Sequence, residues 1–298
     1  MNSRRESLPS QAGGSLAAES IVVDGTRINY WRGTTEHAET VLLLHGLGGD
    51  HRGLVEVAAG LRGVNVLIPD LPGYGDSAPL SRPHGLANYA AAVEALRVGL
   101  GLGPVHLLGH SLGASIALLH ASTFPAALRS LCLVNPVSTA NNLTANLGKI
   151  YYRIAAALPA PLARFWLASK PAVWIADAMI IVSRDKRVRR RILVEDYENY
   201  ARASIPAMIE SFLSYYDTRF EDCAARVAVD SLLVTGDADS IAPPKSVTAL
   251  GAAMSRARVR VLPGGGHLLP LEQPADVVEV VNEFLADRAK GGVGKSHG

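Results

Sequence analysis

A serine flanked by glycines is the first candidate for chemistry in this chain. It stands at the centre of Gly109–Gly113, whose letters are GHSLG. The apolar run Val105–Leu108 precedes it and a segment rich in small residues follows, so a strand is expected before Ser111 and a helix after it. Such a turn projects the serine Oγ out of a sheet, and the glycines leave room for the crowded backbone. Ser111 is therefore predicted to be a nucleophile.

Two later segments offer the groups that would activate this serine. A protonated serine is a weak nucleophile, so it needs an imidazole to take its proton and an anion to orient that imidazole. Leu232–Asp239 contains two carboxylates, and Gly265–Pro274 contains His267. With GHSLG, these segments resemble the α/β-hydrolase superfamily, in which nucleophile, acid and histidine follow in this order. The resemblance extends from about Ile21 to Ala289 and implies an esterase-like or lipase-like serine hydrolase with a helical cap, similar also to carbon–carbon bond hydrolases.

The resemblance implies one role for each member of a catalytic triad. Ser111 attacks the substrate, His267 acts as general base and then as general acid, and Asp239 holds the imidazole tautomer. Asp237 is the competing carboxylate, with capping of the turn as its alternative role, and the family spacing favours Asp239. Some relatives carry the acid after the preceding strand, where this chain has the uncharged Asn135.

Acyl transfer also needs hydrogen-bond donors for the oxyanion. The resemblance implies the backbone N–H groups of Leu112 and of Leu47, which lies in the glycine-rich turn His45–Gly49. His45 itself is expected to anchor the backbone. The turn fails the G-x-G-x-x-G pattern of dinucleotide sites because the third glycine would fall at His51. No cofactor is expected.

The elements that must position these residues alternate between short apolar runs and longer amphipathic segments. Together with the resemblance, this predicts an α/β-hydrolase fold, a mainly parallel eight-stranded sheet with helices on both faces and an inserted helical lid. Asp24-Gly25 predicts an antiparallel hairpin between Ile21–Val23 and Arg27–Trp31. Further strands are expected at Val41–Leu44, Val64–Pro69, Val105–Leu108, Leu131–Asn135, Ser231–Thr235 and Val259–Leu262, and helices at His51–Leu61, Leu86–Val98, Leu112–Ser122, Lys245–Met254 and Pro274–Ala289.

The alternation stops between Ser138 and about Val227, a stretch without a convincing strand. In the family, an insertion at this place forms a helical lid over the nucleophile. The expected divisions are a flexible tail (1–20), a core in two pieces (21–138 and 228–290), the lid (139–227) and a second tail (291–298). The candidate pocket residues are His110, Tyr151, Phe165, Trp166 and Trp174; the alternative for the lid aromatics is that most pack the lid's own core.

Composition excludes several classes of protein. With 48% apolar and 19% charged residues, the chain is typical of a soluble globular enzyme. Lys and Arg exceed Asp and Glu by only 29 to 27, so binding to nucleic acid has no electrostatic basis. Cys132 and Cys223 belong to no metal-ligand pattern, and no metal is expected. Neither a signal-peptide stretch nor a run long enough to span a membrane is present, so a cytoplasmic location is expected.

A cluster of six cations between Arg184 and Arg191 follows an apolar stretch that holds Trp174 and Met179. The favoured interpretation is a solvated helix face that pairs with the acidic residues Glu195, Asp196 and Glu198. The alternative is peripheral contact of the lid with an anionic lipid surface, because such contact needs an apolar segment beside a cationic one.

The expected function is hydrolysis of a small-molecule ester of a fairly apolar acid through an acyl-enzyme on Ser111. The main alternative is a carbon–carbon bond hydrolase acting on ring-cleavage diketones, although those relatives usually have Asn at the position of His110. A non-catalytic binding protein on the same scaffold is the other alternative, and the presence of all three triad residues speaks against it.

Overall fold

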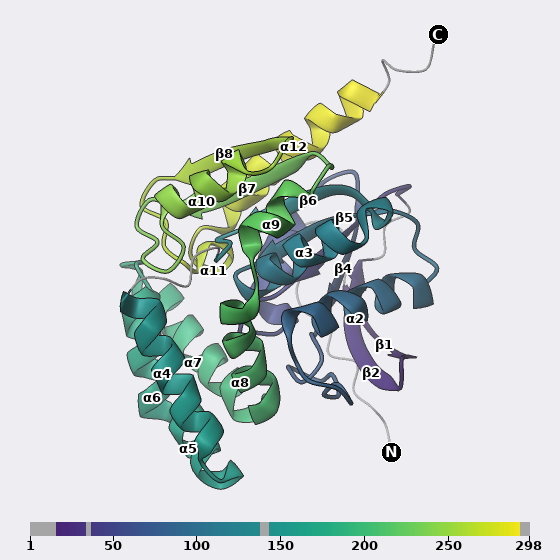
Figure 1. Cartoon of the computed structure of the whole chain (residues 1–298). Coiled ribbons are helices and arrows are strands. Elements are labelled where there is room, and N and C mark those ends of the chain that lie inside the picture. The colour runs from purple at the N-terminus through teal and green to yellow at the C-terminus, as the bar shows by residue number, and fades with distance from the viewer. Residues whose placement is uncertain (1–15, 34–36, 138–142, 293–298) are drawn as a thin grey trace.

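A central sheet of eight strands runs through the protein (Figure 1). The structure, a computed structural model, describes residues 16–33, 37–137 and 143–292. The strand order is β1-β2-β4-β3-β5-β6-β7-β8. The pairs β1–β2 and β2–β4 are antiparallel, and all other neighbours are parallel. The predicted mainly parallel eight-stranded sheet is therefore confirmed.

The first two strands, β1 (Leu16–Val23) and β2 (Thr26–Gly33), form the predicted hairpin. Its turn places Asp24 at φ 48° and Gly25 at φ 73°, a backbone region that Asp-Gly tolerates. Because β1 begins at Leu16, the predicted tail of residues 1–20 is too long. The segment from Leu16 to Ser20 has no strand pattern of its own, and pairing with β2 makes it a strand.

The predicted site residues follow the carboxyl ends of several of the remaining strands. They are β3 (Thr40–Leu44), β4 (Asn65–Pro69), β5 (Val105–His110), β6 (Leu128–Val134), β7 (Ser231–Gly236) and β8 (Ala257–Leu262). Every residue of β5 and β7 is buried, which explains why these runs lack polar alternation.

Helices cover both faces of the sheet, and two apolar cores result. Along β3, Leu42 and Leu44 pack toward one face whereas Val41 and Leu43 pack toward the other. The helices of the first core are α2 (Leu86–Gly99), α3 (Leu112–Thr123), α9 (Phe220–Ala225) and α10 (Pro244–Ala252). Those of the second core are the 3-10 helix η1 (His51–Leu54), α1 (Val55–Gly60), α11 (Leu269–Glu272) and α12 (Pro274–Gly292). The helix expected over His51–Leu61 is thus divided into η1 and α1, and α12 ends two residues beyond the expected core boundary at 290.

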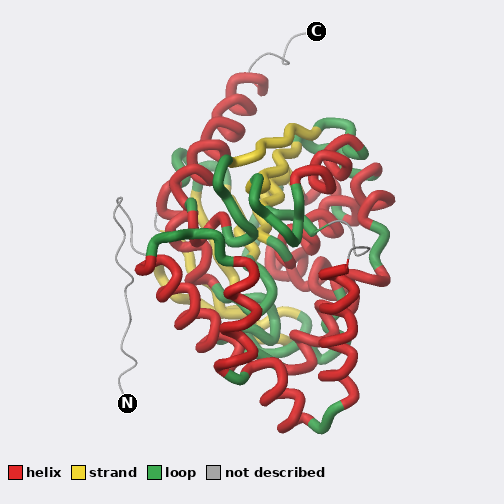
Figure 2. The backbone as a smooth tube through the Cα atoms, turned by 90° about the vertical axis from the view of Figure 1, so that its left-hand side faces the viewer, coloured by secondary structure: helices red, strands yellow, loops and turns green. Residues whose placement is uncertain are grey.

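Five further helices, called the inserted helices below, lie between β6 and α9 in the chain and form a group of their own beside the α/β layers (Figures 1 and 2). They are α4 (Leu143–Ala157), α5 (Ala160–Ala168), α6 (Lys170–Ile180), α7 (Lys186–Arg202) and α8 (Ile205–Leu213), and the 3-10 helix η3 (Ser214–Asp217) follows. Prolines in the first turns of α5, α6 and α8 fix their starts, since proline suits the first helical positions. The beginning of the predicted insertion, 139–142, lies outside the described residues.

Candidate active site

The serine of the GHSLG segment occupies a strained turn between β5 and α3. Ser111 has φ 51° and ψ −112°, as a sharp strand-to-helix turn requires. A Cβ on Gly109 would lie 2.2 Å from the carbonyl oxygen of Gly113, and a Cβ on Gly113 would lie 2.2 Å from that of Leu44. Glycine is therefore required at both positions to let the turn pack against β3.

The structure brings the three predicted triad side chains into one hydrogen-bonded chain. Ser111 Oγ lies 2.9 Å from Nε2 of His267, which stands in the loop between β8 and α11. The other ring nitrogen, Nδ1, lies 3.0 Å from Oδ2 and 3.2 Å from Oδ1 of Asp239. Nδ1 therefore donates to the carboxylate, which leaves Nε2 free to accept the serine proton.

Asp239 is held ionised by the turn after β7. Its Oδ1 accepts hydrogen bonds from the backbone N–H groups of Ile241 and Ala242, each at 2.8 Å. Burial raises the pKa of Asp239, but the hydrogen bonds and charge of His267, with the backbone donors, outweigh burial and leave the pKa below its usual value. Asp237, by contrast, accepts from the backbone N–H of Gly264 at 2.8 Å and makes no contact with the histidine ring. The carboxylate that faces His267 is thus Asp239.

A fourth side chain, to which the sequence analysis gave no role in the site, completes the surroundings of Asp239. Asn135 follows β6 with φ 49°, and its Nδ2 donates to Asp239 Oδ2 at 2.7 Å and to the carbonyl oxygen of Gly266 at 3.1 Å. It therefore ties the acid to the histidine loop. The available signal was an asparagine at the strand end where some relatives place their acid.

The side chain before the nucleophile supports the same loop. His110 Nε2 donates to the carbonyl oxygen of His267 at 2.8 Å. Burial, followed by the proximity of His267, lowers the pKa of His110 to about 4. His110 is consequently neutral near pH 7, and its hydrogen bond fixes the backbone that carries the predicted base.

The predicted oxyanion loop follows β3 and reaches the inserted helices. A backbone hydrogen bond from Gly49 N–H to the carbonyl oxygen of Gly46, at 3.1 Å, closes the turn, and Leu47 lines the cavity beside Ser111. Gly48 has φ 71°, and a Cβ there would lie 2.1 Å from the ring of Tyr200 in α7. Leu112 is the first residue of α3, where backbone N–H groups lack helical partners.

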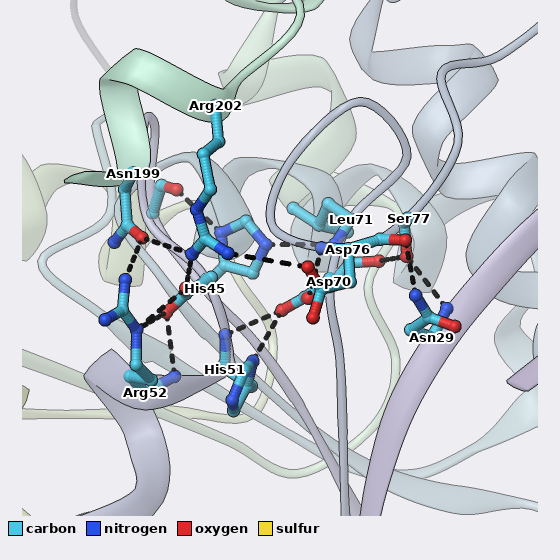
Figure 3. Close-up of polar contacts among 12 residues, drawn as sticks. Asn29, His45, His51, Arg52, Asp70, Leu71, Asp76, Ser77, Asn199 and Arg202 are labelled. Carbon is cyan, nitrogen blue, oxygen red and sulfur yellow. Dashed lines mark hydrogen bonds and ion pairs between the residues drawn. The ribbon is translucent and has the colours of Figure 1, made fainter. Parts of the chain in front are cut away.

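Buried hydrogen bonds anchor this loop to the turn after β4 (Figure 3). His45 donates from Nδ1 to the carbonyl oxygen of Gly46 at 2.8 Å and accepts at Nε2 from the backbone N–H of Leu71 at 2.9 Å. Asp70 accepts from both the backbone N–H and Nδ1 of His51, each at 2.9 Å. The histidine of the loop thus positions backbone, as the sequence analysis expected.

A second group of contacts in Figure 3 connects η1 with α7. Arg52 and Arg202 both form ion pairs with Asp50, whose side chain is fully buried. The oxygen of the Asn199 side chain accepts from both arginines, and Glu198 pairs with Arg52 at 2.9 Å. Helix α7 is thereby fixed to the core beside the predicted oxyanion loop.

A cavity of about 280 Å³ lies between the core and the inserted helices. Ser111, His110 and His267 form part of its core side. On its other side stand carboxylates and aromatic rings from α6, α7, α8 and η3; they are Asp177, Asp196, Tyr200, Phe212, Tyr215 and Tyr216. A substrate in this cavity would contact the nucleophile and the inserted helices together.

The four aromatic residues predicted for the pocket do not line it. Tyr151 packs against the ring of Trp166 and donates its hydroxyl to that residue's carbonyl oxygen at 2.6 Å. Phe165 and Trp174 lie on the outside, 72% and 40% exposed. The sequence offered these aromatic residues as candidates without the orientation of their helices, and α6 turns Ala176 and Asp177 toward the cavity while Trp174 faces away.

The basic cluster also differs from the favoured interpretation. Arg191 pairs with Glu56 and donates to the carbonyl oxygen of Leu271, and Arg189 donates to carbonyl oxygens of the segment before α7. Glu195, Asp196 and Glu198 form no ion pair with the cluster in the described parts of the chain; Arg191 only lowers the pKa of Glu195, against the larger opposing effect of burial. The other four cations, Arg184, Lys186, Arg187 and Arg190, are exposed.

Comparison with known proteins decides the family. The model of the alpha/beta hydrolase family matches residues 41–280, a range that includes the GHSLG turn, the acidic turn after β7 and the loop that carries His267. The chain belongs to the alpha/beta hydrolase family. The predicted α/β-hydrolase fold is thereby confirmed, and the protein is a hydrolase.

Relatives of this alpha/beta hydrolase include Lipase 3 of Moraxella sp. (strain TA144), 23% identical, with 92% of this chain and 85% of the relative covered. Among solved structures, a membrane phospholipase A described as a bacterial virulence factor has a TM-score of 0.76 at 23% identity, over 92% of this chain and 87% of that one. The esterase EaEST from Exiguobacterium antarcticum has a TM-score of 0.77 at 17% identity, over 90% and 98%.

Two further findings concern the described residues alone. Within them, no three His, Cys, Asp or Glu side chains are grouped so as to hold a metal ion. Nor does any helix of those residues have the length and apolar character needed to cross a membrane.

Proposed function

We propose that this hydrolase cleaves carboxylic esters through an acyl-enzyme on Ser111. The observation that carries the proposal is the hydrogen-bonded chain from Ser111 Oγ through His267 to Asp239, with distances of 2.9 and 3.0 Å. A serine in an ordinary turn needs neither a base nor an oriented carboxylate. The same three groups, at the edge of a cavity, are what nucleophilic acyl transfer requires.

In the first half of the reaction, Ser111 Oγ bonds to the ester carbonyl carbon while His267 Nε2 takes the serine proton. The carbonyl oxygen becomes an anion that the backbone N–H groups of Leu47 and Leu112 stabilise. The carbon–oxygen bond to the alcohol then breaks, and His267 gives its proton to the departing alcohol. Asp239 stays ionised and stabilises the imidazolium.

In the second half, a water molecule replaces the alcohol. His267 takes a proton from this water as its oxygen bonds to the acyl carbon, and the same nitrogen then returns a proton to Ser111 Oγ as the ester bond to the enzyme breaks. One ester and one water are consumed, one alcohol and one acid leave, and the enzyme regains its starting state.

The cavity favours a fairly apolar acid, because Ile180, Phe212 and Leu268 line it beside the nucleophile. We assign the inserted helices α4–α8, with η3, to a lid and the sheet with its remaining helices to the core. The predicted lid of 139–227 extends too far, because α9 packs against α3 and α10 of the core. Under this division the lid forms the part of the cavity farthest from the sheet, so acyl and alcohol selectivity would reside mainly in its helices.

A fluorophosphonate probe tests the nucleophile. The proposal predicts stoichiometric covalent labelling of the wild-type protein, because an activated serine attacks phosphorus, and no labelling of Ser111→Ala. Mass spectrometry of the labelled peptide identifies the modified residue. Full labelling of Ser111→Ala would refute the assignment, and a wild-type protein that resists the probe would favour the binding-only alternative.

A substrate panel tests the bond that is cleaved. We expect turnover of p-nitrophenyl esters with acyl chains of increasing length and none of a ring-cleavage diketone. The reverse result would favour the carbon–carbon bond hydrolase. His110 weighs against that alternative, because it occupies the position where those relatives usually have Asn.

We also propose that the outer face of the lid contacts an anionic lipid surface. Large apolar side chains stand exposed on α5 and α6, among them Phe165 at 72%, Ile175 at 65% and Met179 at 69%. The exposed cations at the start of α7 would add electrostatic attraction. An apolar outer surface of this kind is unusual for a protein that contacts only water.

A further inference from the structure

Two carboxylic acids from neighbouring helices meet in the wall of the cavity. Asp177 in α6 and Asp196 in α7 both line the cavity that also contains Ser111 and His267. Asp177 is only 4% exposed. The two carboxyl groups lie close enough for each to act on the pKa of the other. Asp177 is therefore buried, Asp196 is half-buried, and the two lie close together in the wall of the cavity.

Nothing in the described parts of the chain compensates this pair. Oδ2 of Asp177 is buried and has no hydrogen-bond donor there. No Lys or Arg of those parts forms an ion pair with either aspartate; Arg52 pairs with Asp50 and Glu198 instead, and Arg191 pairs with Glu56. A buried carboxyl oxygen without a donor is costly, and the residue that carries it lines a cavity large enough for a ligand.

Other carboxylates near the pair add to its negative charge. Burial raises the pKa of Asp177 to about 7, and burial and the charge of Asp177 raise the pKa of Asp196 well above its usual value. Glu195 and Asp50 raise the pKa of Asp196 further. Tyr200, the phenol beside the pair, has its own pKa raised by burial and so stays neutral. Near neutral pH the pair therefore holds a shared proton that a cation could replace.

We propose that Asp177 and Asp196 bind an ammonium group of the substrate. This inference rests on the proposed ester hydrolysis and names its substrate class, which is esters with a cationic nitrogen in the acyl or the alcohol part. The ammonium N–H groups would supply the donor that Asp177 Oδ2 lacks, and the shared proton would pass to solvent. The faces of Tyr200 and Phe212, which line the same cavity, suit the alkyl groups next to such a nitrogen.

A metal ion fits the pair less well than an ammonium group does. Calcium takes about six to eight oxygen ligands and magnesium demands a near-octahedral set. The described residues offer two carboxylates here, and their other neighbours in the cavity include Ala176 and Ile180. Two oxygens and an apolar rim match a cation that already carries hydrocarbon.

Matched pairs of esters test the proposal. The acyl pair is p-nitrophenyl 6-aminohexanoate against p-nitrophenyl heptanoate, and the alcohol pair is 4-aminobutyl butyrate against pentyl butyrate. For at least one pair, we expect wild-type kcat/KM to favour the amine by about tenfold or more, as hydrogen bonds to charged groups allow. The preference should rise between about pH 6 and about pH 8, because the pair ionises while the amine stays protonated.

Three variants show whether the aspartates cause the preference. Asp177→Asn and Asp196→Asn should bring the amine-to-neutral ratio close to one, with melting curves that show a folded protein. Glu221→Gln removes the same charge from an exposed position on α9 and should keep the wild-type ratio. A wild-type ratio near one for both pairs, or an equal loss of preference in Glu221→Gln, would overturn the proposal.

Binding to an inactive protein separates this proposal from the proposed reaction. If wild-type protein cleaves no neutral ester, ester hydrolysis fails, and calorimetry of butylammonium with Ser111→Ala still tests the subsite. Saturable binding that Asp177→Asn abolishes supports it. Absence of binding, or displacement of butylammonium by magnesium or calcium at equal concentration, would overturn it.

Discussion

The α/β core and the inserted helices differ in two respects, the pairing of their buried charged groups and the exposure of their large apolar side chains. In the core, buried charged groups have partners, as Asp70 has in His51 and Asp239 in His267. In the inserted helices, Asp177 is buried without a cation. Of thirteen large apolar side chains exposed among the described residues, ten belong to α4–α7; they are Leu147, Ile150, Ile154, Leu162, Phe165, Trp166, Trp174, Ile175, Met179 and Val194.

This difference suits the two regions to different roles. The core pairs its buried carboxylates with basic side chains and backbone N–H groups, and it can therefore hold reacting atoms in one arrangement. The inserted helices leave both charge and apolar surface without partners, which suits contact with molecules outside the chain. Each region should accordingly respond to mutation in its own way.

The largest effect is expected at the acid of the core. Asp239→Asn should lower kcat on a p-nitrophenyl ester by roughly a thousandfold or more, because the amide no longer holds the His267 tautomer. The matched change Asp237→Asn removes a carboxylate that only caps a turn, and we expect a loss below about threefold. Steady-state kinetics on both variants, with circular dichroism for the fold, gives the answer. Equal losses or the opposite ranking would show that the acid is misassigned.

A smaller effect is expected at Asn135, the core residue that holds Asp239 in position. Asn135→Gly keeps a residue that tolerates φ 49° and deletes the amide that donates to Asp239. We expect kcat to fall by roughly tenfold while KM changes little, since the deleted bond orients the triad without touching substrate. Asn135→Asp also tolerates the backbone but places a second carboxylate against Asp239, and it should lose more. Wild-type kinetics in both variants would contradict the positioning role.

In the inserted helices, mutation of the aspartate pair should change how the free energy of unfolding depends on pH. The folded protein holds protons on Asp177 and Asp196 at pH values where the unfolded chain has lost them. The pair should therefore make the free energy of unfolding fall as pH rises from about 4 toward 7, by roughly 1 kcal/mol per pH unit, while buried histidines such as His110, whose pKa is lowered, act in the opposite direction. Urea denaturation should show that the stability of Asp177→Asn relative to the wild type increases with pH across this window, and Glu221→Gln should follow the wild type. A stability difference between Asp177→Asn and the wild type that stays constant through this window would contradict the buried pair.

The smallest effect on turnover is expected on the outer face. Phe165→Ser and Ile175→Ser should reduce co-sedimentation with anionic vesicles while turnover of a dispersed ester stays within about twofold. Val98→Ser is the matched control, because Val98 is 59% exposed but belongs to α2 of the core. Higher salt should weaken the binding of the wild type. Wild-type protein that stays in the supernatant at low salt would rule out lipid contact.

The two regions also differ in how well sequence predicts them. Buried parallel strands and the turns after them have local patterns, so the sheet and the proximity of Ser111 and His267 could be predicted. The orientation of an inserted helix depends on its neighbours, and periodicity does not say which molecule its apolar face meets. Trp174 was for that reason expected inside and lies outside. The meeting of Asp177 with Asp196 joins two helices and has no local pattern.

Two features of the core could not be predicted from local sequence patterns. Leu16 and the residues after it become a strand only because β2 lies beside them. Asn135 acts on Asp239 across more than a hundred positions of sequence, through a sheet order that places β6 next to β7. Both depend on pairing between distant segments rather than on the letters nearby.

The contacts between α7 and η1 have a consequence for how substrate reaches the cavity. If α7 left the core, Asp50 would lose Arg202, and Arg52 would lose Glu198 and Asn199. Removing one of the two cations that pair with a fully buried carboxylate costs free energy, so such an opening is rarely populated. Backbone amides of α7 should then exchange with deuterium more slowly than those of α4 and α5, for which the described residues show no ion pair with the core.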